Sequence, residues 1–168
     1  ATFEVTGTAE AGASVTVTFG DQSQTAVATP SGGFTVTFDT PADGSYTLAA
    51  TVTDDAGNTG PAASTTVTVD TTASGGADNV VVAGDNVVNG AEASGFAITG
   101  TAEAGSTVSI TIGDDTLSGT ADSSGTFSID ATGLTLDEGA AQASVVVTDG
   151  SGNTSDPTLA DFTVDTLA

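Results

Sequence analysis

Hydrophobic and polar residues alternate along much of this chain with a period of two. Val15, Val17 and Phe19 are separated by threonines, and the segments 34–38 and 67–69 repeat the pattern. Such alternation predicts half-buried β-strands whose threonine side chains face solvent. Gly, Asp, Asn, Ser and Pro separate these strands at near-regular intervals, and only 89–93 suggests a single helical turn. The pattern predicts an all-β fold of the sandwich type.

The strand pattern occurs twice, because the chain contains an internal repeat. Thr6–Gly12 recurs letter for letter at Thr99–Gly105, an offset of 93 residues, and later matches have an offset of 95. The two inserted residues are expected after Asp130. We therefore predict two tandem domains, residues 1–72 and 80–168, joined by a linker at 73–79.

The second copy begins with a segment that the first copy does not have. Residues 79–82 of this leading segment predict a first strand, which gives the second domain seven strands. The first domain begins at its second strand and therefore lacks its leading edge strand. Two sources of that strand remain open, an upstream part of the parent protein and a neighbouring chain.

Composition then removes most classes of chemistry. The chain of 168 residues has 22 Asp and Glu, no Lys, Arg, His, Cys, Met or Trp, and a formal charge of −22. Without His, Cys or Lys there is no catalytic triad, thiolate nucleophile, Schiff base or His- or Cys-ligated zinc. The charge argues against nucleic acid and anionic membranes as partners, and no apolar run is long enough for direct membrane insertion. We expect a protein that is not an enzyme.

Unbalanced negative charge repels itself, and this chain has no disulfide to offset the repulsion. A bound divalent cation would offset it, and carboxylate and carbonyl oxygens suit hard ions such as calcium. The alternative is that the acidity only keeps a halophilic or marine surface protein soluble. Calcium is the expected cofactor, although another divalent ion fits the same oxygens.

Several motifs in order resemble the bacterial Ig-like tandem repeats of giant secreted adhesins. They are Thr6–Gly12, a Val-Thr-Val strand at 15–17, Thr-Asp-Asp-Ala-Gly-Asn-Thr at 53–59, Val-Asp-Thr-Thr at 69–72, and the segment 84–92. The resemblance covers almost the whole chain and implies immunoglobulin-like β-sandwiches with Greek-key topology. It also implies extracellular display on a bacterial surface, type I secretion of the parent, and calcium at domain junctions. One departure is Gly150-Ser151 in place of Asp55-Ala56, which would weaken a metal ligand in the second copy.

Chain direction suggests which acidic loops share an end of each domain. The turn with Glu10 and the loop that begins at Asp54 are expected at one end, and Asp70 at the other. Stacking of two copies would bring Asp70 toward Glu103 and Asp149, where like charges are costly unless a cation neutralises them. The candidate metal ligands are Asp70, Asp78, Glu103, Asp149 and Asn153 at this junction, Glu10, Asp54 and Asp55 at an upstream junction, Asp165 at a downstream one, and Asp85, Asn89 and Glu92 as a separate cluster. The alternative for Asp54 and Asp149 is ordinary turn chemistry without metal.

Two functions are compatible with these features. The first is a structural spacer whose partners are neighbouring Ig-like repeats of the same protein. The second is a filament subunit that takes the missing strand from an identical subunit and forms a head-to-tail homopolymer. A glycan-binding module is disfavoured, because one Tyr, seven Phe and no Trp leave few rings to stack on sugars. Tyr46, near the start of a late strand, predicts a tyrosine corner.

Overall fold

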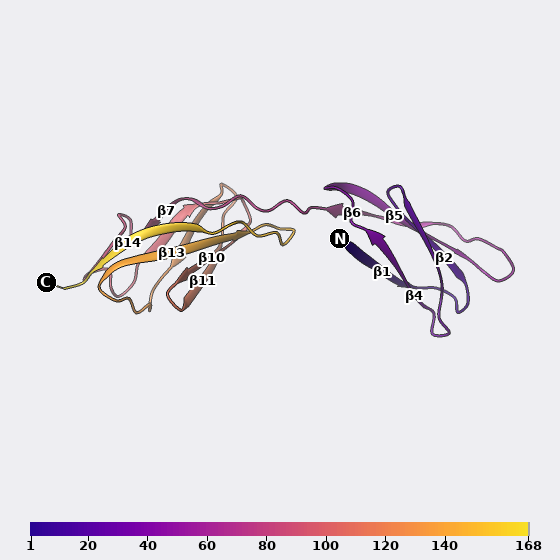
Figure 1. Ribbon diagram of the computed structural model, residues 1–168, viewed down its shortest axis with the longest axis horizontal. Coiled ribbons are helices and arrows are strands. Elements are labelled where there is room, and N and C mark those ends of the chain that lie inside the picture. The colour runs from indigo at the N-terminus through magenta and orange to yellow at the C-terminus, as the bar shows by residue number, and fades with distance from the viewer. Residues whose placement is uncertain (168) are drawn as a thin grey trace. The chain divides into compact units, whose positions relative to one another are not determined.

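The computed structural model describes residues 1–167, and these form strands, turns and loops without an α-helix. The chain divides into two units, Ala1–Thr71 (unit 1) and the residues from Thr72 onward (unit 2). Each unit consists of two sheets, and most of their strands are labelled in Figure 1. The prediction of an all-β protein with two tandem sandwich domains is confirmed. The described residues contain no helix that is long and apolar enough to span a bilayer.

Unit 1 has six strands in sheets of two and four. Strand β1 pairs with β4, and the second sheet has the order β3-β2-β5-β6. The strands are β1 (Thr2–Thr8), β2 (Ser14–Phe19), β3 (Gln22–Val27), β4 (Gly33–Asp39), β5 (Gly44–Thr53) and β6 (Ala63–Val69). The alternation in β2 buries Val15, Val17 and Phe19 against the opposite sheet. Phe19 packs there on the ring of Phe38, with 6.0 Å between the ring centroids.

Unit 2 repeats this arrangement and adds two strands before it. Its sheets have the orders β12-β9-β7 and β11-β10-β13-β14-β8. The strands are β7 (Asp78–Val82), β8 (Val87–Asn89), β9 (Ala97–Thr101), β10 (Thr107–Ile112), β11 (Asp115–Thr120), β12 (Thr126–Asp130), β13 (Gly139–Thr148) and β14 (Thr158–Asp165). The two inserted residues fall in the loop between β12 and β13, where the repeat predicted them.

The leading segment of unit 2 crosses from one sheet to the other. Strand β7 pairs antiparallel with β9, whereas β8 pairs parallel with β14. The turn between them places Ala83, Gly84 and Asn86 at positive φ, and the Asn86 side chain accepts a hydrogen bond from the Val82 N–H at 2.9 Å. The prediction of a single leading strand and seven strands is therefore wrong, because this left-handed turn divides the valine-rich run into two strands.

Unit 1 has no counterpart of β7 or β8 among the described residues, as its shorter sequence predicted. In unit 2, Val82 and Val88 from these strands are at most 1% exposed and close the core. The core of unit 1 instead consists of five buried side chains with partly exposed hydrophobic residues around them. The two units thus share a fold and differ in how completely their cores are covered.

Tyr46 forms the tyrosine corner that its position predicted. Its hydroxyl donates a 2.8 Å hydrogen bond to the carbonyl oxygen of Ala42, four residues upstream. Its ring packs on Phe19 with a centroid distance of 5.2 Å. The side chain thereby fixes the loop that leads into β5.

Candidate functional site

The chain enters unit 2 at one end, and three separate acidic segments meet the same end. Asp78 starts β7 opposite Thr101, the last residue of β9. Thr107 starts β10 opposite Thr148, the last residue of β13. The turn with Glu103 and the loop with Asp149 therefore lie at the end where β7 begins. This is the shared position that chain direction suggested for Asp78, Glu103 and Asp149.

The carboxylate of Asp149 is used within its own loop. One of its oxygens accepts hydrogen bonds from the N–H groups of Ser151 and Asn153, at 2.8 and 2.9 Å. The other accepts the side-chain amide of Asn153 at 3.0 Å. The Asn153 side chain, followed by the backbone donors, holds the pKa of Asp149 below its ordinary value, because these bonds favour the charged form. Turn chemistry thus accounts for the placement of both residues.

Unit 1 has the same loop at its corresponding end. Asp54 accepts the backbone N–H of Asn58 at 2.8 Å and its side-chain amide at 2.9 Å, and the pKa of Asp54 is lowered mainly by that amide. Asp55 extends toward the turn that contains Glu10: a Cβ placed on Gly12 would lie 3.9 Å from a carboxylate oxygen of Asp55. Glu10, Asp54 and Asp55 therefore lie at one end of unit 1, as predicted.

The opposite end of each unit contains a contact that the sequence analysis missed. After β6, which ends just before Asp70, the N–H and hydroxyl of Thr71 both donate to the Asp43 carboxylate at 2.7 Å. In unit 2 the N–H and hydroxyl of Thr166, the residue after Asp165, donate to Glu138. The signal was present in the sequence, as an acidic residue before Gly at equivalent positions of the two repeats.

The third candidate cluster is divided by strand β8. Asp85 precedes β8 and accepts the N–H of Val87 at 2.9 Å. Asn89 ends β8 and starts one helical turn, in which Glu92 accepts the Asn89 N–H at 3.1 Å and the Asn89 side chain accepts the Glu92 N–H at 3.3 Å. This reciprocal arrangement is a capping box. The structure brings Asn89 and Glu92 together and places Asp85 apart from them, while Asp165 pairs with Asn89 across the strands.

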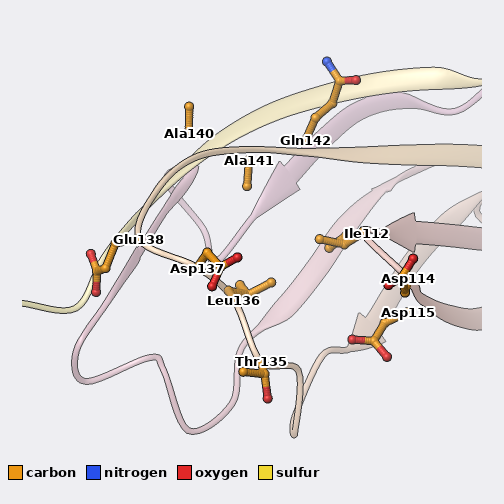
Figure 2. Close-up of a pocket in the computed structure, with 11 residues that line it drawn as sticks. Ile112, Asp114, Asp115, Thr135, Leu136, Asp137, Glu138, Ala140, Ala141 and Gln142 are labelled. Carbon is orange, nitrogen blue, oxygen red and sulfur yellow. The ribbon is translucent and has the colours of Figure 1, made fainter.

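Sequence reasoning placed no pocket in unit 2, and the structure has a hollow of about 440 Å³ there. Figure 2 shows Asp114 in the turn between β10 and β11 and Asp115 at the start of β11, with Asp137 on the loop between β12 and β13 across from them. Leu136 lies on the same loop, lines the hollow and packs against the core. Across the described residues, no group of three or more acidic side chains is gathered closely enough to hold a metal ion.

The chain matches the family model described as bacterial Ig domain twice, over residues 1–70 and 76–164. No curated protein is similar enough to count as a match. Among solved structures, it is 33% identical to a Ca²⁺-stabilized adhesin that helps an Antarctic bacterium reach out and bind ice, with a TM-score of 0.50 over 99% of this chain and 45% of that one.

A second similar structure is a 1.5-MDa bacterial ice-binding adhesin, which is 33% identical, with a TM-score of 0.47 over 99% of this chain and 58% of that one. The chain thus spans about half the length of these two structures. The fibronectin(III)-like modules of Clostridium thermocellum CbhA are 18% identical, with a TM-score of 0.61 over 98% of this chain and 86% of that one, and support the fold alone.

Proposed function

The chain belongs to the bacterial Ig domain family, and from this membership we propose that it is a pair of extender repeats in a bacterial cell-surface adhesin, made rigid by calcium at the domain junctions. Domains of this family are structural modules and not enzymes in kind. The role is to project a binding domain away from the cell, so the proposed location is extracellular and the proposed partners are neighbouring repeats.

One observation carries the proposal: within each unit the chain leaves from the end opposite to its acidic Asp54 or Asp149 loop. In unit 2, β13 runs toward the loop that holds Asp149, and β14 pairs with it antiparallel and runs away. In unit 1, β6 runs away from the Asp54 loop in the same manner. In unit 2 the chain enters at Asp78 beside the Asp149 loop and leaves at the opposite end, so this module adds its length to a tandem array. In unit 1 only the exit follows this pattern, because β1 starts at the end where β6 leaves.

Calcium is supported by the acidity and by the Ca²⁺-stabilized relative, and the described residues constrain how it would bind. Calcium takes six to eight oxygen ligands. We propose that Asp78, Glu103 and the Asp149 loop, which lie at one end of unit 2, supply ligands, together with Asp70, which follows β6, or Asp165, which ends β14. Backbone carbonyls would complete the shell.

Calorimetry with and without calcium tests this proposal. For a site with a dissociation constant near 10⁻⁴ M in about 10 mM calcium, mass action adds roughly 2.7 kcal/mol to stability. We expect chelation to lower the melting temperature of the wild type. Glu103→Gln should reduce that shift, whereas Glu4→Gln, an equal charge change on an exposed strand position, should leave it intact. A melting temperature that is the same in calcium and in chelator would exclude the calcium part of the proposal.

A second candidate function is a subunit of a polymeric extracellular filament assembled by strand exchange. The specific observation in its favour is that, among the described residues, β1 pairs only with β4 and β6 only with β5, so each has one unpaired edge. A contact in which one molecule supplies the strand and the next receives it does not close on itself, so it propagates into a fibre. Electron microscopy separates the two functions, since the extender role predicts dispersed particles and the filament role predicts fibres.

A further inference from the structure

The leading segment and the last strand of unit 2 pass through the sandwich in the same direction. Strand β7 starts at Asp78, at the end with the Asp149 loop, and β8 continues toward the opposite end. Strand β14 also runs away from the Asp149 loop and ends at Asp165. The chain therefore enters one of these segments and leaves the other at opposite ends of unit 2.

The two segments are joined directly by the parallel pairing of β8 with β14. This contact has three residue pairs, Val87 with Thr163, Val88 with Val164 and Asn89 with Asp165. At its start, the N–H of Thr163 donates a 3.0 Å hydrogen bond to the carbonyl oxygen of Asn86. The side chains of Val88 and Val164 are only 1% and 2% exposed. The contact thus combines main-chain pairing with buried apolar side chains.

The chain just past β14 is held by two neighbouring segments. The carboxylate of Glu138 accepts hydrogen bonds from the N–H and the hydroxyl of Thr166. Gly90 follows β8 and approaches the same residue closely, since a Cβ placed on Gly90 would lie 3.3 Å from the carbonyl oxygen of Thr166. Asn89 and Glu92 fix the turn at the end of β8. Fraying of the end of β14 therefore requires these contacts to break.

We propose that the β8–β14 pair is a mechanical clamp, which resists stretching of unit 2 between its entering and leaving chain. The proposal rests on the extender function, because an extender carries tension along its chain. A pull on the entering chain draws β8 toward the end with the Asp149 loop, and a pull on the leaving chain draws β14 the opposite way. The hydrogen bonds of a sheet join neighbouring strands sideways, so this sliding motion loads the whole set together.

A pull in another direction would load the same strand one residue pair at a time. Gly139 lies opposite Val164 at the open end of the β13–β14 hairpin, and the loop with Asp149 closes its other end. Drawing β13 and β14 apart at the open end peels the hairpin, and each pair then breaks before the next one is loaded. Peeling therefore needs less force than sliding. Resistance that depends on direction distinguishes a clamp from a domain that is only thermally stable.

Single-molecule force spectroscopy of the full 168-residue chain, in buffer with a chelator, tests the clamp. The chain has no cysteine, so pairs of introduced cysteines give unique attachment points. Gly75→Cys, where an added Cβ would meet nothing within 4 Å, and Leu167→Cys, at a side chain that is 76% exposed, load unit 2 by sliding. Thr135→Cys, at an exposed position before β13, combined with Leu167→Cys loads it by peeling. We expect rupture by sliding to need at least about twice the force of rupture by peeling.

A matched pair of core variants then locates the resistance. Val88 on β8 and Val108 on β10 are both at most 1% exposed, so Val88→Ala and Val108→Ala remove the same buried atoms. Val88 belongs to the clamp, whereas β10 pairs with β11 and β13 and lies outside it. At constant force in the sliding geometry, Val88→Ala should unfold about tenfold faster than the wild type, and Val108→Ala less than about threefold faster.

The two measurements decide the proposal independently of each other. Equal rupture forces in the two pulling directions, or equal effects of the two alanine variants, would overturn the clamp. If Val88→Ala does not fold, the comparison of pulling directions decides alone, because it leaves the core unchanged. Neither result bears on the extender role, which calorimetry and scattering in calcium test separately.

Discussion

Truncation of Val147 should destabilise unit 2 more than the same truncation of Val52 destabilises unit 1. The two valines occupy equivalent positions on β13 and β5, but Val147 is 0% exposed and Val52 is partly exposed. Val→Ala removes two carbon atoms, each worth about 0.8 kcal/mol when buried, and leaves a cavity besides. We expect a loss of about 2 to 3 kcal/mol for Val147→Ala and about 1 kcal/mol for Val52→Ala.

A second pair of valines provides the control. Val108 and Val15 are equivalent, and both are 0% exposed, so their alanine variants should cost the same within about 0.5 kcal/mol. Denaturant titration followed by hydrogen exchange reports the two units separately, and Tyr46 fluorescence reports unit 1. Equal costs at Val147 and Val52 would refute the claim that the leading segment closes the core of unit 2.

Two further predictions concern hydrogen bonds. Tyr46→Phe removes the hydrogen bond to Ala42 and should destabilise unit 1 by about 1 kcal/mol. Calorimetry measures this loss, because the variant has no tyrosine left for fluorescence. A loss near zero would show that the corner does not hold the loop. Because hydrogen bonds lower the folded-state pKa of Asp149, its contribution is present above the unfolded pKa and is lost as pH falls through the folded value. The melting-temperature difference between the wild type and Asp149→Asn should therefore shrink from about pH 6 to about pH 3, and a difference independent of pH would contradict this.

The strands and the repeat were predictable because both leave a periodic trace in the sequence. The alternation around Val15 and Phe19 predicts a strand from strand geometry alone. The exact recurrence of Thr6–Gly12 predicts the repeat from a comparison of the chain with itself. The missing edge strand of unit 1 followed from aligning the two copies. These inferences succeeded because each depends on residues close together in sequence or on identical letters.

The division of the leading segment was not predictable from the same information. Val80–Val82 and Val87–Val88 are both apolar runs, and nothing local indicates that they join different sheets. The bond of Glu138 to Thr166 joins residues 28 positions apart and was missed, although an acidic residue precedes Gly at the equivalent position of both repeats. Metal ligands were harder still to predict from the sequence. An Asp, Asn or Glu in a turn can accept hydrogen bonds from the backbone or cap a helical turn, and the same residue types bind metal ions. Glu92 in its capping box shows this ambiguity.

Small-angle X-ray scattering of the 168-residue chain in calcium, and again after chelation, is the most direct test of a calcium-stiffened extender. The account predicts a longer maximum dimension and a narrower distribution of particle shapes in calcium, since bound ions would restrain the linker between the units. Scattering curves that superimpose under the two conditions would contradict it.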